Sequence, residues 1–259
     1  MDTVSAGFED RDRYDRQKRI EWMDMDGISS ANVLVAGAGA LGNEVVKNLV
    51  LSGFRRITVV DMDDIVLSNL NRCLFFRDDD VRIRMKSEVV AERASELAPD
   101  VEITPIVGRI QDVDVEPFDV ILGCLDNILA RLDVNAAACF YGIPYIDGAT
   151  DGMRGKVHVV LSEGPCLQCV TNRTHVKTME LRHTCTGNSM FTPHTASDVT
   201  TTAIVAAMQV REAMKVASGH TELCLTNVTY YDGTICDMFT AEADVDPSCP
   251  NHRRECDDH

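Results

Sequence analysis

A glycine-rich turn between an apolar segment and a helical segment constrains the fold of this chain most strongly. Gly37, Gly39 and Gly42 form G-x-G-x-x-G directly after the apolar run NVLVA and before a helix expected over residues 41–52. Glycines allow a tight turn and let backbone amides approach a phosphate at the positive end of a helix. Asp61 ends the next apolar segment, about 20 residues further on, where a carboxylate can bind ribose hydroxyls. The pattern predicts a nucleotide-binding strand–helix–strand unit.

Strands and helices continue to alternate beyond this unit. The segments VEITPIV, FDVILGCLD and PYIDG are expected to be strands, and MKSEVVAERASELAP and NILARLDVNAAACFYG have helical period. This alternation predicts a doubly wound, Rossmann-like α/β fold with a mostly parallel sheet and helices on both faces. After about residue 151, we expect additional antiparallel strands at KVHVVLS, NVTYYDG and TICDMFTA, and another helix over 198–219.

The chain is long enough for one domain with one core, because 45% of its 259 residues are hydrophobic. Residues 1–30 are expected to form a charged helical arm, with the helix over 11–30, and residues 31–259 a single domain. Its first half, 31–150, would bind the nucleotide. Its second half, 151–259, contains a long polar segment, 171–197, and polar segments of this length in compact domains are usually functional.

Charge and hydropathy exclude several classes of partner. The formal net charge is −16, from 41 acidic and 25 basic residues, which disfavours nucleic acid because phosphate binding needs excess Lys and Arg. No stretch approaches 18 uncharged apolar residues, so no membrane-spanning helix is expected. The charged N-terminal region also lacks the apolar segment of a secretion signal. We therefore expect a cytoplasmic protein.

The glycine turn alone favours a nicotinamide- or flavin-dependent oxidoreductase, and the residues that follow distinguish another class. Asn69, Arg72 and Lys86 follow Asp61 closely, and a dry hydride-transfer pocket has no evident use for them. An enzyme that directs attack on the α-phosphate of ATP needs such groups, because charge spreads over the phosphoryl oxygens in the transition state. Asp126 ends a later strand at the expected carboxyl edge of the sheet, where it could bind Mg²⁺ beside polyphosphate.

The motifs that follow one another along the chain are R-Y-D-R-Q, G-A-G-A-L-G, D-M-D-x-x-x-x-S-N-L-N-R, Lys86 and C-L-D-N-x-x-x-R. Taken in this order, they resemble the motifs of the MoeB/ThiF/ubiquitin-activating superfamily. The resemblance runs from about Arg13 to the last cysteines. The stretch 124–160 is most similar to the catalytic subunits of ubiquitin-like modifier-activating enzymes. One departure is Cys73, where a glutamine usually follows the arginine, and it puts the local hydrogen bonding in doubt.

The resemblance implies an adenylation domain over 31–259 that uses Mg·ATP to activate the C-terminal carboxylate of a ubiquitin-like or sulfur-carrier protein. It implies that the glycine turn holds ATP and that Asp61 binds the ribose. The phosphates would be contacted by Asn69, Arg72 and Lys86, and Mg²⁺ would be held by Asp126. Arg16 would reach across the interface of a homodimer into the partner's ATP site. The segment 151–259 would bind the modifier protein.

Five of the ten cysteines stand apart from the others. Cys166-x-x-Cys169 has the spacing of a metal knuckle, because two thiolates on a tight turn can share one Zn²⁺. The tail offers Cys249 with either His252 or Cys256 to complete the site, which would clamp the tail to the core. The alternative is two cysteine pairs without metal. Packing is the interpretation for the cysteines that stand singly among apolar residues: Cys73, Cys124, Cys139, Cys224 and Cys236.

Cys185 lies in the polar segment 171–197 with no partner at metal spacing. The resemblance places the thioester-forming cysteine of modifier-activating enzymes here, and a thiol with a lowered pKa is a competent nucleophile. Adenylation followed by thioester formation is therefore our first hypothesis, with transfer to a downstream conjugating protein. The alternative is a sulfur-carrier adenylyltransferase of the MoeB/ThiF type that does not need this thiol, and a more remote one is an NAD-dependent oxidoreductase.

Overall fold

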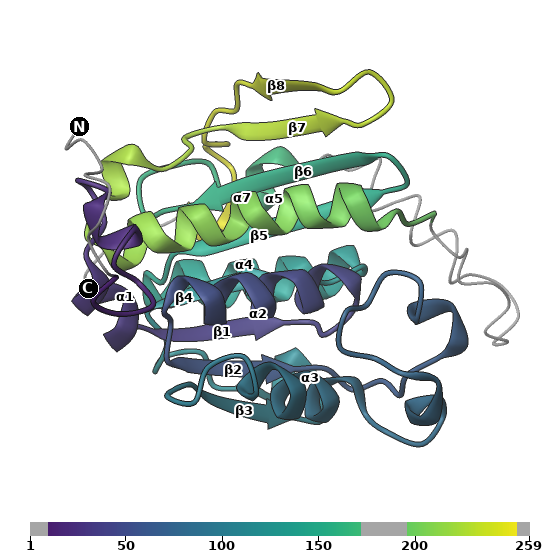
Figure 1. Cartoon of the computed structure of the whole chain (residues 1–259). Helices are drawn as coiled ribbons and strands as arrows, with labels where there is room; N and C mark the ends of the chain where they lie inside the picture. Colours follow the sequence, from purple (N-terminus) through teal and green to yellow (C-terminus); the bar gives the residue numbers. More distant parts are fainter. Residues whose placement is uncertain (1–9, 172–195, 253–259) are drawn as a thin grey trace, which may run out of the picture.

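An eight-stranded sheet runs through the computed structural model, which describes residues 10–171 and 196–252 (Figure 1). The strand order is β3-β2-β1-β4-β5-β6-β7-β8; β1 to β5 pair in parallel, and β6, β7 and β8 extend the sheet in antiparallel pairs. This confirms the fold class expected from the sequence. The strands are β1 (Asn32–Ala36), β2 (Arg56–Val60), β3 (Glu102–Ile106), β4 (Val120–Gly123), β5 (Tyr145–Asp151), β6 (Arg154–Val160), β7 (Val228–Asp232) and β8 (Asp237–Ala241).

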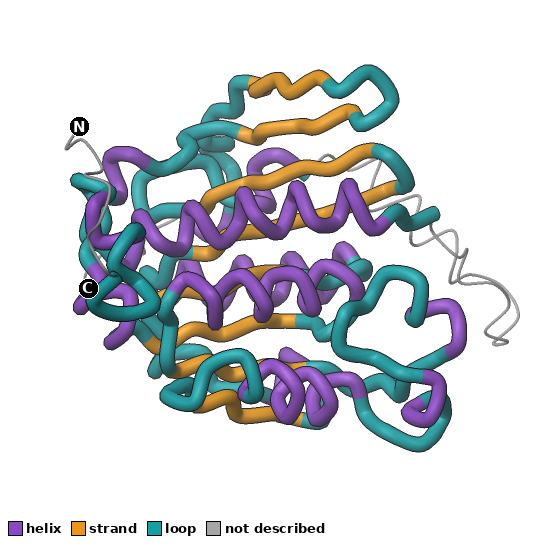
Figure 2. Tube along the Cα trace, viewed as in Figure 1, coloured by secondary structure: helices purple, strands orange, loops and turns teal. Residues whose placement is uncertain are grey.

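Helices cover both faces of the sheet, as Figures 1 and 2 show. The α-helices are α1 (Met25–Ser30), α2 (Ala40–Ser52), α3 (Lys86–Ser95), α4 (Ile128–Tyr141), α5 (Leu167–Val170) and α7 (Val199–Ala217). Short 3-10 helices span Gln17–Arg19, Leu67–Asn69, Asp78–Asp80, Ile110–Asp112, Thr221–Leu223 and Pro250–His252. None of the helices in the described ranges is long and apolar enough to cross a membrane.

Alternate residues of the central strands bury their side chains in two separate cores. On β1, Val33 and Val35 pack in the core beneath α2, α3 and α7, whereas Leu34 packs in the core shared with α4 and α5. Each of these three side chains is fully buried, as expected for a parallel sheet covered on both faces. The two layers leave the carboxyl ends of β1, β2 and β4 at one common edge of the sheet.

The glycine turn between β1 and α2 has the conformation that its sequence predicts. Gly37 has φ of +103°, and a Cβ at this position would lie 2.5 Å from the Cys124 carbonyl oxygen at the end of β4. A Cβ at Gly42 would collide with the Gly37 carbonyl oxygen. The Asn43 side chain donates to Ala38 O over 2.9 Å. Glycine is therefore required at these positions because other backbone atoms approach closely. The hydrogen bond from Asn43 to Ala38 O holds the turn in place.

The expected helical arm forms only in part. Within residues 10–30, the helical stretches are the 3-10 helix Gln17–Arg19 and α1, with turns and bends between them. Contacts to the body replace a continuous helix: Arg13 Nη2 donates to Leu97 O over 2.9 Å, and Gln17 Nε2 to Ser52 O over 2.7 Å. The arm has no apolar stripe of helical period, so these local contacts determine its course.

Candidate functional site

The Asp61 carboxylate lies against the glycine turn, directly after β2. Its Oδ2 accepts from the Ala38 amide over 2.7 Å, and its Oδ1 accepts from the Asp63 amide over 2.9 Å. Burial raises the pKa of Asp61, and the charge of Lys86 and these two amides oppose that rise. The carboxylate is thus placed at the mouth of the turn with a fixed orientation, where it could accept hydrogen bonds from ribose hydroxyls.

Lys86 begins α3 and directs its ammonium group toward the same place. Its Nζ donates to Asp63 Oδ2 over 2.7 Å and lies 3.9 Å from Asp61 Oδ1. Burial of Lys86 disfavours the charged form, but Asp61, Asp63 and Asp126 outweigh it, so the pKa of Lys86 is raised. The side chain is only about 12% exposed and remains a cation.

Asp126 completes the group from the end of β4. The loop that carries it is held at one side by the Cys124 amide, which donates to Ala36 O over 2.8 Å. At the other side Asn127 caps α4, accepting from the Leu129 amide over 2.9 Å. The Asp126 side chain is exposed and acts electrostatically on Lys86. The carboxylates of Asp61 and Asp63 therefore flank the Lys86 ammonium at the carboxyl edge of the sheet, and the Asp126 carboxylate acts on it from the end of β4.

The remaining phosphate-binding candidates lie in the loop between β2 and α3. Asn69 is buried, and its Oδ1 accepts from the Val66 amide over 3.0 Å, so it shapes the loop. The Arg72 guanidinium donates to Ser68 O and, over 3.0 Å, to Asn71 Oδ1. Burial raises the pKa of the neighbouring Cys73 thiol to about 12.

Two of the sequence-predicted site residues lie outside the described ranges, namely Cys185 and Cys256. Arg16 is described, and its side chain is 87% exposed, with its Nε 3.7 Å from Asp10 Oδ1. Within the described residues this is the ion pair that Arg16 makes, and it leaves the guanidinium projecting from the surface of its own chain.

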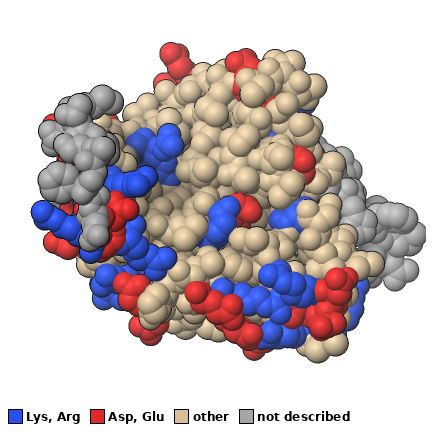
Figure 3. Space-filling model, viewed as in Figure 1, with Lys and Arg blue, Asp and Glu red and all other residues tan. Residues whose placement is uncertain are grey.

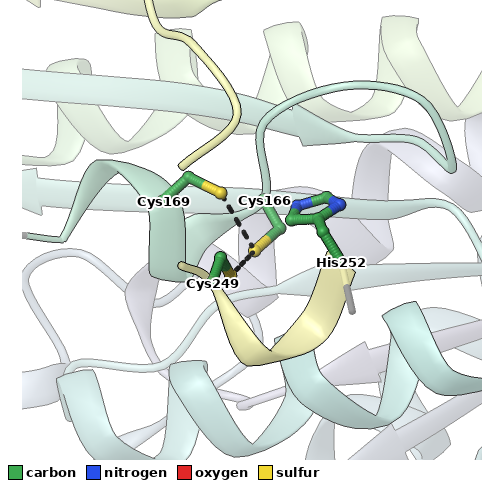
Figure 4. A group of neighbouring side chains, drawn as sticks. All are labelled: Cys166, Cys169, Cys249 and His252. Atoms are coloured by element: carbon green, nitrogen blue, oxygen red, sulfur yellow. Dashed lines mark hydrogen bonds between the residues drawn. The ribbon is translucent and has the colours of Figure 1, made fainter. Parts of the chain in front are cut away.

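A cluster of four potential metal ligands lies beside α5 (Figure 4), formed by Cys166, Cys169, Cys249 and His252. One ligand atom from each residue lies within 4.8 Å of every other. The Sγ atoms of Cys166 and Cys169 are 3.8 Å apart, and those of Cys166 and Cys249 are 3.6 Å apart. Thiolates on a tetrahedral Zn²⁺, with Zn–S bonds of about 2.3 Å, lie about 3.8 Å apart. The geometry of the cluster therefore fits zinc.

The surroundings of the cluster also fit a cation. The buried His252 Nε2 has no hydrogen-bond partner within the described residues, which leaves it free to bind a metal. A hydrogen bond from Cys139 lowers the pKa of Cys166, against the effect of its burial, and so favours the thiolate that zinc requires. Burial raises the pKa of Cys249.

Cys139 is a residue that sequence reasoning missed. Its position among apolar residues of α4 indicated packing, and Cys139 does pack, half-buried, against the core shared with α4 and α5; its thiol also interacts with Cys166. Its spacing from Cys166 matches no metal knuckle, so a spacing rule could not identify it. Among the other cysteines assigned to packing, Cys73 and Cys224 are buried and Cys124 is half-buried. Cys236 is exposed, so the packing interpretation is wrong for this residue.

A glycine turn between a strand and a helix, with carboxylates and an ammonium group at the carboxyl edge of a parallel sheet, is typical of α/β nucleotide-binding proteins. Residues 14–251 match the ThiF family, and the chain belongs to this family. This match includes the glycine turn, the loop between β2 and α3, and all of the zinc cluster except His252.

The chain is also similar to curated activating enzymes. It is 41% identical over 154 residues to the NEDD8-activating enzyme E1 catalytic subunit of Arabidopsis thaliana, an alignment covering 53% of this chain and 34% of that one. It is 28% identical to the SAMP-activating enzyme E1 of Haloferax volcanii, with 96% of this chain and 91% of the relative covered. The chain thus spans about a third of the plant relative.

Among solved structures, MccB of E. coli crystallised with ATP superposes with a TM-score of 0.79 and 21% identity, covering 96% of this chain and 75% of that chain. At this identity the likeness supports the fold alone.

Proposed function

We propose that this protein activates the C-terminal carboxylate of a ubiquitin-like protein by ATP-dependent adenylation. The observation that carries the proposal is the convergence of Asp61, Lys86 and Asp126 at the mouth of the glycine turn. The names of the curated relatives, which include NEDD8-, SUMO- and SAMP-activating enzymes, support this class of substrate.

The geometry favours catalysis by positioning and charge rather than by proton transfer. The substrate carboxylate is already a nucleophile at neutral pH, so attack on the α-phosphate needs alignment and stabilisation of the developing charge. Asp61 would orient the ribose, the amides at the start of α2 would contact phosphate, and Lys86 would neutralise phosphoryl oxygens. Bound at Asp126, Mg²⁺ would supply further charge neutralisation.

Lys86 then has two sets of partners. In the structure it pairs with Asp63 and Asp61, and a bound triphosphate would compete for the same ammonium. Arg72 would turn from its contacts within the loop toward the phosphates, a change of side-chain rotamer with little backbone movement. These residues are therefore arranged to receive an anion.

We further propose that the acyl-adenylate is attacked by the Cys185 thiolate, which forms a thioester and releases AMP. The similarity to modifier-activating enzymes, 41% identity over 154 residues to the plant relative, supports this step. The alternative is a sulfur-carrier adenylyltransferase, in which adenylation occurs and Cys185 is dispensable.

The surface over α7 and the β7–β8 hairpin suits a protein substrate. Figure 3 shows that charged side chains gather over the arm and the β2–β3 side of this face, whereas the surface over α7 and the hairpin is largely uncharged. On the hairpin, Phe239 is about half exposed and stacks on Tyr230 with ring centroids 5.3 Å apart. Met238, the preceding residue of β8, is also about half exposed but lies on the opposite face of the strand. Exposed apolar residues of this kind mark protein interaction sites.

Zinc would serve as a structural clamp. Cys166 and Cys169 lie at α5, whereas Cys249 and His252 come from the C-terminal segment, so one ion would fasten that segment to the body. Within the described residues the fourth ligand would be His252, and Cys256, which lies outside them, is the alternative.

The test is pyrophosphate exchange. The purified chain should incorporate labelled pyrophosphate into ATP only when a cognate ubiquitin-like or sulfur-carrier protein is present. It should show no binding of NAD. Nicotinamide binding without any exchange would instead favour the oxidoreductase alternative.

A further inference from the structure

A single side-chain amide joins the ends of two central strands. The β4–β5 ladder ends at the pair Gly123 and Asp147. There, Gln209 Nε2, from the middle of α7, donates to Gly123 O and to Ile146 O, each over 2.9 Å. Gln209 is fully buried. Its amide therefore fixes the separation of β4 and β5 where their backbone pairing stops.

The neighbouring residues are shaped to admit this amide. A Cβ at Gly148 on β5 would collide with the Gln209 carboxamide, and Gly148 does not have positive φ. Glycine at position 148 therefore leaves room for the Gln209 carboxamide. The Gln209 Oε1 atom is buried without a hydrogen-bond partner in the described part of the chain, which costs stability. Stability alone does not account for a buried amide here.

The position of this amide relates it to the ATP site. Gly123 is followed by Cys124, whose amide bonds to β1, and then by Leu125 and Asp126. On the opposite face of the sheet, the Arg131 guanidinium holds the buried Asp147 carboxylate through Nε, over 2.8 Å, and through Nη2. The loop with Asp126 is therefore anchored through the ends of β4 and β5 from both faces.

We propose that Gln209 is a positioning residue for Asp126: by bridging Gly123 and Ile146, it holds the loop so that the Asp126 carboxylate faces the phosphates and Mg²⁺. This inference rests on the proposed function, which assigns Mg²⁺ to Asp126. Displacement of a supporting group by an ångström is enough to weaken such a site. Gln209 itself touches neither the metal nor the nucleotide.

The experiment measures ATP binding by calorimetry across a Mg²⁺ titration, which requires no modifier protein. Gln209→Met keeps the volume of the side chain and removes both hydrogen bonds, and it should raise the half-saturating Mg²⁺ concentration about two- to tenfold. Gly148→Ala, which displaces the amide sterically, should shift it in the same direction. Val210→Ala, at a buried neighbour on α7, is the control for general destabilisation and should leave it unchanged.

Because Gln209 acts through Asp126, its effect should disappear when Asp126 is absent. Gln209→Met added to Asp126→Ala should weaken Mg²⁺-dependent ATP binding no further than Asp126→Ala alone. Full additivity, or an unchanged Mg²⁺ requirement in both Gln209→Met and Gly148→Ala, would overturn the inference while leaving the proposed function intact. If Gln209→Met does not fold, Gly148→Ala decides. Absence of Mg²⁺-dependent ATP binding in the wild-type chain would overturn the proposed function and this inference together.

Discussion

The Lys86 ammonium lies 3.9 Å from the Asp61 carboxylate, across the mouth of the glycine turn. The two groups come from different elements: Asp61 follows β2 and Lys86 begins α3. Burial acts against the charge of both, and each stabilises the charge of the other. The charge states of Asp61 and Lys86 are therefore electrostatically coupled, and with them the ribose-binding and phosphate-binding roles that we propose for the two residues.

This coupling predicts how Asp61 titrates. Its carboxyl should titrate above 3.8, because burial raises its pKa more than Lys86 and the amides lower it. ATP affinity should then be present above that pKa and be lost as the pH falls through it. Lys86→Met removes a charge that favours the carboxylate, so the pKa of Asp61 should rise further.

Carbon-13 NMR of the Asp61 carboxyl checks this titration. Lys18→Met, which removes a cation that pairs with Asp12 in the arm, is the matched control and should leave Asp61 unchanged. An Asp61 that titrates at or below 3.8 in the wild-type chain would contradict the assigned burial effect.

The cysteine cluster predicts about one Zn²⁺ per chain. Cys166→Ser should lose the metal and lower the melting temperature, because a structural zinc site contributes its binding free energy to folding. Metal analysis and thermal melting of His252→Ala and Cys256→Ala, side by side, should show loss only in the first. Cys236→Ser, at an exposed thiol, should retain metal. Zinc-free wild-type protein that melts normally would rule out the clamp.

The exposed Arg16 predicts function as a homodimer in which each arm serves the partner's ATP site. Arg16→Ala chains and Asp126→Ala chains should each be inactive alone. Mixed and allowed to exchange subunits, they should recover about a quarter of wild-type activity, because half of the dimers are mixed and each has one complete site. Lys18→Ala, two residues along the arm, should stay active alone. Proven mixing without recovery would show that Arg16 does not act in trans.

The thioester hypothesis predicts a covalent adduct between the chain and its modifier in the presence of Mg·ATP. Thiol reductant should release the adduct, and Cys185→Ala should prevent it while leaving pyrophosphate exchange intact, since the thiol acts after the anhydride has formed. Cys236→Ala should form the adduct normally. Full transfer to an acceptor by Cys185→Ala would favour the sulfur-carrier alternative.

Periodicity and spacing were sufficient to predict much of this molecule. The glycine motif located the β1–α2 turn, and the matched cysteine knuckles paired Cys166 with Cys249 across the length of the second half of the chain. The glycine motif has one geometric solution, whereas the cysteine spacing left open whether His252 or Cys256 is the fourth ligand. The positions of Cys139 and Gln209 were not predictable in this way. A thiol among apolar residues and an amide within a helical repeat reveal their partners only when α4 and α7 are docked on the sheet.

In the N-terminal arm, residues 11–30, the sequence predicted more helix than the structure contains. Its charged residues, 11–30, satisfied a helical interpretation, yet contacts of Arg13 and Gln17 with the body interrupt the helix. Helix propensity is a weak guide where no apolar stripe supports it, because tertiary contacts override it.

The proposed ATP chemistry is tested most directly by modifier-dependent pyrophosphate exchange in Lys86→Ala and Asp126→Ala. Each substitution removes a group that would neutralise charge at the phosphates, so exchange should fall by about a hundredfold or more. Asp126→Ala should change the melting temperature little, because its side chain is exposed and lies outside the two hydrophobic cores. Lys86→Ala leaves the largely buried Asp61 carboxylate without its counter-charge and should lower the melting temperature without preventing folding. The control variant Lys18→Ala should exchange normally. Near-wild-type exchange in both variants would contradict ATP activation at this site.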